Sequence, residues 1–230
     1  MRWSGDSSDV APDLIRLGGG GLRGCSAGPG ETLHVLTIIG RRVNLRQFQP
    51  GDVAWLVGAM SRGSWWRWDA PWEGPPTAAE LRRVPVQMDV LMRERVTPPR
   101  RMVIETRAGT PIGTVSRYWA DVRTQWMEVG VGIYVARHWS KGYGSEALAL
   151  WVDHLFEAMS LRRIGLRTWS GNERMIHLAH RLGFRQEATF REAYATRERA
   201  YDRIAFGLLR REWVRVRRSW PVRSAGSAKR

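Results

Sequence analysis

The chain has 230 residues, of which 37 are Lys or Arg and 22 are Asp or Glu, so its formal net charge is +15. With 43% hydrophobic residues, it can form one domain with extensions, since domains have about 100–200 residues. The single cysteine, Cys25, excludes an internal disulfide, and no apolar run approaches the roughly 18 residues of a membrane helix. We therefore predict a globular cytoplasmic protein without a membrane partner.

The surplus of positive charge is almost entirely arginine. Lysine occurs only at Lys141 and Lys229, and the arginines are spread from Arg2 to Arg230 rather than gathered in one block. Proteins that bind nucleic acid usually concentrate basic residues on one face. The use of arginine almost to the exclusion of lysine is typical of a GC-biased genome, so we expect an acidic cofactor or substrate rather than a nucleic acid.

Composition divides the chain into three parts. Residues 1–40 are rich in Gly and Ser and have no apolar periodicity, which predicts a disordered leader. Residues 215–230 are basic and have few apolar side chains, which predicts a flexible tail. The folded domain is therefore expected at residues 41–214.

Strands and helices alternate within that domain. Period-two patterns and short apolar runs predict strands at 43–48, 101–106, 112–119, 126–135, 163–168 and 204–209. Helical periodicity predicts helices at 50–60, 145–159 and 175–182, and the capping box that begins at Thr77 opens another helix, which Pro85 should kink or split. A Trp-rich segment, 65–72, lies between the first two helices. The alternation predicts a mixed α/β domain.

The strongest chemical signal is a strand that runs into a short loop containing Gly142 and Gly144, which opens directly into an amphipathic helix. Backbone N–H groups at a helix start point outward, and glycine lets a phosphate approach them closely. A tight turn without a ligand is the alternative. The fingerprints of dinucleotide-binding and P-loop proteins are absent, which disfavours nicotinamide cofactors and nucleoside triphosphates.

The strand before this loop has two different faces, because side chains alternate with period two. Val129 and Val131 can pack on a core, whereas Glu128, Gly130 and Gly132 face the other way. Glycine weakens a strand, and a ligand lying against the backbone is one reason to find it there. We expect a slot that runs from a carboxylate to the phosphate loop; bulges and a solvated glutamate are the alternative.

Four ordered blocks resemble the GNAT superfamily of acetyl-CoA-dependent N-acyltransferases. They are Val43-Asn44-Leu45-Arg46, Trp139-Ser140-Lys141-Gly142-Tyr143-Gly144, residues 172–184 and residues 201–213. Trp139 stands where most of the superfamily has Arg or Gln. Trp followed by a small residue, Lys and Gly is familiar in the branch that acetylates the N-terminal alanine or serine of ribosomal proteins, which this chain therefore resembles most.

The resemblance implies a single GNAT-type domain of the α/β (α+β) class, in which helices flank a mixed, mostly antiparallel sheet and a splayed pair of strands holds acetyl-CoA. It implies direct acetyl transfer to a primary amine, with Glu128 as general base and without a metal. The CoA-binding positions that it carries over are Ile133, Val135, Lys141, Gly142, Tyr143, Gly144, Ser145 and Asn172. Trp65, Trp68 and Trp72 match the wall of the acceptor groove, with core filling as the alternative.

One departure from the family concerns the general acid. Many members carry a tyrosine that protonates the leaving thiolate, and Ala179 stands at that position; Tyr143, Tyr194 or a water could substitute. The acceptor is open between a protein N-terminus and a small amine such as a polyamine or aminoglycoside. A basic RNA- or ribosome-associated module without chemistry is the alternative from another class, and a homodimer is also left open.

Overall fold

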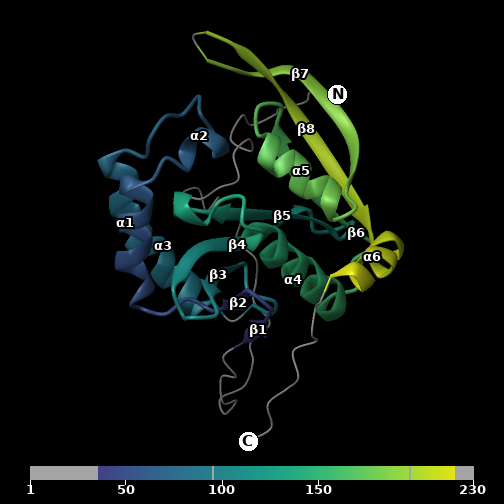
Figure 1. The fold of residues 1–230 in the computed structure, drawn as a ribbon, viewed down its shortest axis with the longest axis horizontal. Helices are drawn as coiled ribbons and strands as arrows, with labels where there is room; N and C mark the ends of the chain where they lie inside the picture. Colours follow the sequence, from purple (N-terminus) through teal and green to yellow (C-terminus); the bar gives the residue numbers. More distant parts are fainter. Residues whose placement is uncertain (1–35, 95, 197, 221–230) are drawn as a thin grey trace, which may run out of the picture.

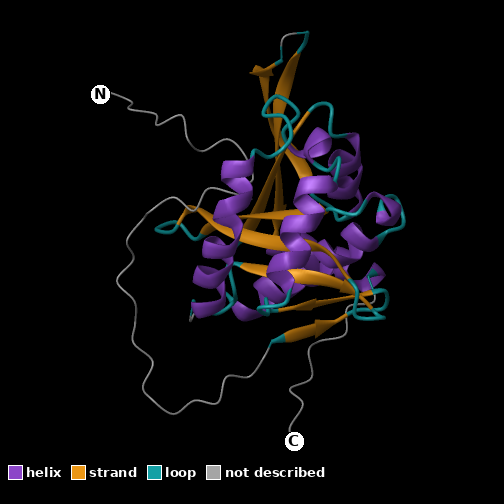
Figure 2. Ribbon diagram, turned by 90° about the vertical axis from the view of Figure 1, so that its left-hand side faces the viewer, coloured by secondary structure: helices purple, strands orange, loops and turns teal. Residues whose placement is uncertain are grey.

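The computed structural model describes residues 36–220, apart from residues 95 and 197. Figures 1 and 2 show strands crossing the middle of the molecule with helices on either side. The elements in chain order are β1 (Thr37–Ile39), β2 (Val43–Arg46), α1 (Asp52–Arg62), α2 (Trp66–Asp69), α3 (Ala78–Arg93), β3 (Arg101–Thr106), β4 (Pro111–Asp121), β5 (Trp126–Ile133), the 3-10 turn η1 (Ala136–His138), α4 (Tyr143–Ala158), β6 (Arg163–Trp169), α5 (Glu173–Arg181), β7 (Arg185–Ala195), β8 (Ala200–Leu209), α6 (Arg210–Val216) and η2 (Arg217–Ser219).

The eight described strands form one sheet in the order β1-β2-β3-β4-β5-β6-β8-β7. Each neighbouring pair is antiparallel except β5 and β6, which run parallel. Parallel neighbours need a crossover connection, and α4 provides it here. The expected mixed, mostly antiparallel sheet flanked by helices is confirmed.

The two faces of β5 pack differently, as the period-two pattern predicts. Met127 and Val129 are buried in the main core together with Trp151 of α4. On the opposite face, α1 and α3 form a second apolar cluster, in which Met88 packs with Tyr134. The sheet therefore lies between α4 and α5 on one side and the α1–α3 layer on the other (Figure 1).

Strands β5 and β6 stay together for only two residue pairs, Met127 with Ile164 and Glu128 with Gly165. Beyond these pairs β6 continues along β8, while residues 129–133 of β5 continue along β4. The other edge of that part of β5 faces no strand of the described chain. This is the splayed pair that the family resemblance implies.

The fold extends past both boundaries expected from composition, residues 41 and 214. At the first, β1 pairs with β2, and Ile38 is buried in the main core. At the second, α6 ends at Val216, and both Val216 and Trp220 pack against the same core. A three-residue strand and a single extra turn are too short to produce a detectable period. The rest of the expected leader and tail, residues 1–35 and 221–230, lies outside the described residues.

Strand β7 and helix α3 also differ from the expectations. The sequence does not predict β7, because most of its side chains are exposed and register shifts interrupt its pairing with β8. The split expected at Pro85 does not occur: α3 is one helix, and burial of Val84 and Met88 compensates for the backbone hydrogen bond that proline cannot make. None of the helices in the described part of the chain is long and apolar enough to cross a bilayer.

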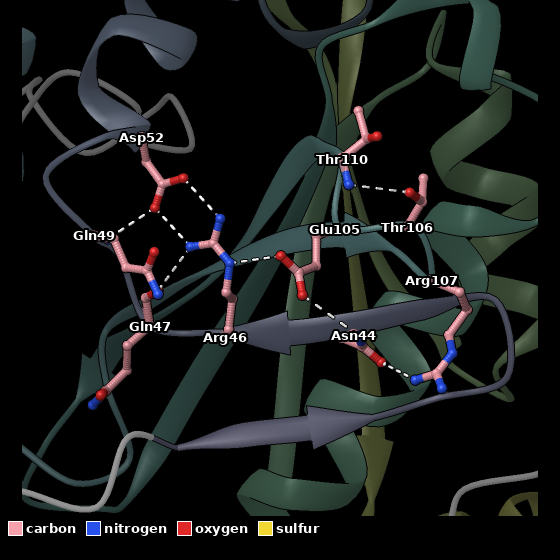
Figure 3. A network of polar contacts seen from close by, with 9 residues as sticks. All are labelled: Asn44, Arg46, Gln47, Gln49, Asp52, Glu105, Thr106, Arg107 and Thr110. Atoms are coloured by element: carbon pink, nitrogen blue, oxygen red, sulfur yellow. Dashed lines mark hydrogen bonds and ion pairs between the residues drawn. The ribbon is translucent and has the colours of Figure 1, made fainter.

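Arg46 fastens the start of α1 to the sheet (Figure 3). Its Nη1 and Nη2 donate to Asp52 at 2.7 and 2.8 Å, and its Nε donates to Glu105 of β3 at 2.6 Å. Hydrogen bonding to Asp52, opposed by burial and supported by Glu105, raises the pKa of Arg46 above its ordinary value. Two partly buried carboxylates therefore share one guanidinium, which fixes the α1–α3 layer relative to β2 and β3.

Replacing Ile38 by Ala tests whether β1 belongs to the core. Ile38 is 3% exposed, so Ile38→Ala should leave a cavity and lower the free energy of unfolding by about 2–4 kcal/mol. Ile39 in the same strand is 52% exposed, so Ile39→Ala should cost less than about 1 kcal/mol. Urea unfolding compares the two variants, and equal losses would show that Ile38 does not anchor β1.

Candidate active site

A large cavity of about 990 Å³ follows the open edge of β5. Both faces of the strand line it, Val129 and Val131 from one and Glu128 and Gly130 from the other, as expected for a cavity that runs along a strand edge. Val135 and Lys141 are absent from the wall. The other candidate residues line it together: Trp65, Trp68, Trp72, Glu128, Ile133, Gly142, Tyr143, Gly144, Ser145 and Asn172.

The loop before α4 has the geometry of an anion site. Gly142 precedes the helix with φ of +82°, a left-handed conformation that glycine adopts without a steric cost. Glu146 N donates to Gly142 O at 3.0 Å, so the N–H groups of residues 143–145 come before the first bond of the helix. These groups lie at the positive end of the helix dipole, where a phosphate binds favourably.

Arg42 and His138 lie beside this loop. Arg42 Nη1 donates to the carbonyl oxygen of Lys141 at 2.6 Å and would lie 3.2 Å from a Cβ on Gly142. His138 lines the cavity, and burial, followed by the nearby positive charges, lowers its pKa. Arg42 was missed by the sequence reasoning, because it lies about a hundred positions before the loop and belongs to no motif.

Trp139 fixes the loop to the end of β5. Its Nε1 donates to the carbonyl oxygen of Ile133 at 2.7 Å, so that carbonyl already has a partner. This bond gives a physical role to the residue that stands where most of the superfamily has Arg or Gln. Ile133 lines the cavity, but its carbonyl oxygen is hydrogen-bonded to Trp139 within the protein.

Both polar groups of the Asn172 side chain are bonded to the protein. Oδ1 accepts from Met175 N at 3.1 Å and caps α5, while Nδ2 donates to the carbonyl oxygen of Trp68 at 2.6 Å. Trp169 Nε1 donates to the same carbonyl at 3.0 Å. Asn172, expected from the resemblance to contact CoA, thus also joins the start of α5 to α2.

Aromatic rings fasten the Trp-rich segment to its surroundings. The Arg174 guanidinium lies between two indoles, 4.1 Å from the ring centroid of Trp68 and 4.6 Å from that of Trp139. Trp72 stacks on Tyr194 of β7 with centroids 4.1 Å apart. The wall of the cavity opposite β5 is therefore held by α5, the phosphate loop and the β7–β8 hairpin.

Trp65 differs from the other two tryptophans of the segment. It is buried in the second apolar cluster, its Nε1 donates to Met60 O at 3.2 Å, and its ring meets Tyr134 edge-on at 5.6 Å. Trp65 is therefore mainly a core residue, which was the alternative to a role in acceptor binding. One part of its surface still lines the cavity.

Glu128 is 3% exposed and forms an ion pair with Arg167, whose Nε donates to Oε2. Tyr118 is the direct partner of Glu128 in the β4–β5 register, and the Arg167 guanidinium lies 5.9 Å from its ring centroid. Burial, followed by the charge of Glu128, raises the pKa of Tyr118 well above its ordinary value, so its hydroxyl stays protonated. The sequence reasoning missed Arg167 and Tyr118, because only the register shows that they meet Glu128.

Asp69, the last residue of α2, is a second carboxylate in the wall of the cavity. Burial, followed by the negative charge of Glu73 and opposed by Arg101, raises its pKa to about 7. The sequence reasoning missed it, although an acid inside a Trp-rich segment is a usable signal for a functional site.

Ala179, at the position of the missing tyrosine, is fully buried in the main core. Tyr118, Tyr143 and Tyr194 line the cavity instead. Burial raises the pKa of Tyr194 to about 12, which keeps its phenol protonated at neutral pH. Within residues 36–220, no three His, Cys, Asp or Glu side chains are placed to hold a metal ion.

A splayed strand pair, a phosphate-binding helix start beside it and a carboxylate on the open strand define the acyl-CoA-dependent transferase class. Residues 42–185 match the family described as the acetyltransferase (GNAT) domain. The chain belongs to this family.

The sequence matches to relatives cover only part of this chain. It is 31% identical over 103 residues to "Uncharacterized N-acetyltransferase p20" of Bacillus licheniformis, which is 45% of this chain and 57% of that protein. It is 26% identical over 106 residues to "Putative ribosomal N-acetyltransferase YdaF" of Bacillus subtilis, 46% of this chain and 57% of that protein. The chain thus spans a little over half the length of these relatives.

The fold is shared with solved structures. Spermidine N-acetyltransferase from Vibrio cholerae, in complex with CoA and spermine, superposes with a TM-score of 0.63 and 18% sequence identity. The match covers 75% of this chain and 98% of that one. A likeness at this identity concerns the fold.

Replacing Gly142 by Val tests the phosphate loop. The new side chain would meet Arg42 and block the approach to the helix start, so acetyl-CoA should bind at least about tenfold more weakly in calorimetry. Gly109 is the matched control: its φ is +77°, and no atom lies within 4 Å of its Cβ position. Gly109→Val should carry similar backbone strain and leave the affinity unchanged. Equal affinities in both variants would contradict the assignment.

Proposed function

We propose that this chain transfers an acetyl group from acetyl-CoA to a primary amine, with Glu128 as the general base. The observation that carries the proposal is the continuous cavity, which joins the N–H groups at the start of α4 to the Glu128 carboxylate along the open edge of β5. An extended thioester with phosphate groups at one end suits a slot of this form.

In this proposal the side chains and backbone of the protein bind the two substrates and accept a proton from the acceptor. An ammonium has no lone pair, so the acceptor must first lose a proton to Glu128, directly or through a water molecule. The amine nitrogen then attacks the carbonyl carbon; a C–N bond forms, the C–S bond breaks, and its electrons leave on the CoA thiolate. The proton that the nitrogen must still lose to become an amide passes to this thiolate, directly or through water, which gives CoA thiol. No residue of the chain forms a covalent intermediate in this scheme.

Arg167 holds the Glu128 carboxylate in place by an ion pair. Burial opposes the charge of Arg167, but Glu128 and Tyr118 together raise the pKa of Arg167 above its ordinary value. Arg167 Nε donates to Oε2, and Tyr118 is a second hydrogen-bonding neighbour of the same carboxylate.

We infer that the acceptor is a protein N-terminus, the ribosomal class that the name of YdaF indicates. A small amine is the second candidate, since the spermidine enzyme of Vibrio cholerae has the same fold. A ribosome-associated module without chemistry explains neither the cavity nor the buried carboxylate in its wall. Thiol release from acetyl-CoA, measured with N-terminal peptides, polyamines and aminoglycosides, separates the acceptor classes.

Changing Glu128 to Gln keeps the shape of the side chain and removes its basicity. We expect kcat to fall by about 10² or more, while the affinity for acetyl-CoA is unchanged. Glu157→Gln is the control, because Glu157 lies on α4 outside the cavity and pairs with Arg217 at 2.9 Å. A Glu128→Gln enzyme that turns over at the parental rate would place the base elsewhere.

A further inference from the structure

Two carboxylates line the cavity, and they differ in whether a protein side chain is paired with them. Glu128 is held by Arg167 at the closed end of the splay, where β5 and β6 are still paired. Asp69 lies on α2, and its carboxylate has neither a hydrogen bond nor an ion pair to any residue of the described chain. Asp69 is half-buried, so its carboxylate faces the cavity without a partner among the described residues, which makes it a candidate for binding a cationic ligand.

The position of Asp69 is fixed rather than loose. The preceding residue, Trp68, has its carbonyl bonded by Asn172 and Trp169 and its ring stacked on Arg174. Three residues later, Trp72 stacks on Tyr194. The carboxylate is therefore held in the cavity wall by contacts on both sides of it, as a binding group needs to be.

Aromatic side chains surround Asp69 in the cavity wall, at a distance from Glu128. Asp69 interacts electrostatically with Tyr134, which follows β5 six residues after Glu128, a separation of about 20 Å along an extended strand. Trp65 and Trp72, one turn before and after Asp69, line the same cavity. Aromatic rings beside a carboxylate suit an ammonium or guanidinium, because both attract positive charge.

We propose that Asp69 binds a second positively charged group of the acceptor, while the reacting amine lies at Glu128. The acceptor class is then an amine with another cationic group, such as a diamine or an N-terminal peptide with a following Lys or Arg. The inference rests on the proposed transfer to an amine, and it adds a specificity-determining residue to that site. Asp69 acts on acceptor affinity, whereas Glu128 acts on turnover.

The charges around Asp69 give the site a pH dependence. Glu73 adds negative charge, Arg101 opposes it, and Tyr134 is neutral because burial raises its pKa. With a pKa of about 7, Asp69 is mostly protonated at pH 6 and mostly ionised at pH 8. Only the ionised form attracts a cation, so binding should strengthen as the pH rises through this range.

The test compares 1,10-diaminodecane, a diamine long enough to reach from Glu128 towards Asp69, with 1-aminodecane, which lacks the second ammonium. Calorimetry with the CoA-bound protein at pH 8 measures affinity without turnover, so it reports on Asp69 even if no acetyl transfer takes place. We expect the diamine to bind at least tenfold more tightly, and Asp69→Asn to reduce this ratio to about threefold or less. The diamine preference of the parent should fall at pH 6, and that of the variant should not change.

Asp89→Asn is the matched control, because Asp89 is an exposed residue of α3 that pairs with Arg93 outside the cavity. It should keep the parental preference. Folding of Asp69→Asn is checked by thermal unfolding: the raised pKa of Asp69 means that its ionised form costs stability above about pH 4, so the variant should gain more in Tm at pH 8 than at pH 5. Equal binding of the two amines by the parent, or an unchanged preference in Asp69→Asn, would overturn the inference.

The outcomes separate this inference from the proposed function. If the Asp69 variant loses the diamine preference while Glu128→Gln keeps its turnover, the base assignment fails and the acceptor site stands. If no amine is acetylated but the diamine preference depends on Asp69, the site binds dications without the proposed chemistry. If amines are acetylated with no preference for a second charge, transfer stands and the inference about Asp69 fails.

Discussion

The separation of β5 from β6 after two residue pairs is the constraint on which the rest of the structure depends. A strand edge with open N–H and C=O groups inside a domain is costly unless something bonds to it. The sheet is continuous on both sides of this point, since β4 and β8 pair fully with the two strands. The flanking strand pairs therefore stabilise the domain, while the unpaired backbone N–H and C=O groups of β5 lie along one slot, which ends at the start of α4.

The wall opposite that slot depends on α5 and the phosphate loop as well as on α2. Asn172 and Trp169 bond the carbonyl of Trp68, and Arg174 lies between Trp68 and Trp139. A ligand that orders the phosphate loop would thus also order the residues next to Asp69. Because the same side chains contact both ends of the cavity, the proposed cofactor and acceptor sites are linked through packed rings rather than through a flexible loop.

The sequence predicts those parts of the fold that have a long period or a local motif. Helix α4, strands β3 and β6 and the capping box of α3 follow from such signals, and the box is confirmed by reciprocal bonds between Thr77 and Glu80. Strand β7 and β1 have no period to detect, because one is exposed and the other is three residues long. Site residues with a motif, such as Gly142, are found in the cavity wall. Arg167 and Tyr118 are recognised only when the register and the fold bring them to this wall.

The arginine surplus acquires a structural meaning once the partners are known. Arg117 donates to the backbone carbonyl of Pro98, and burial, followed by Arg100, lowers its pKa to about 10. Arg210 donates to the carbonyls of Phe156 and Leu161 and thereby joins α6 to the end of α4. A guanidinium can satisfy several carbonyls at once, which a lysine ammonium does less well because its donors are not held in a plane. Arg117 and Arg210 therefore act inside the fold, where each guanidinium joins separate segments of the chain without an acidic partner in its described part.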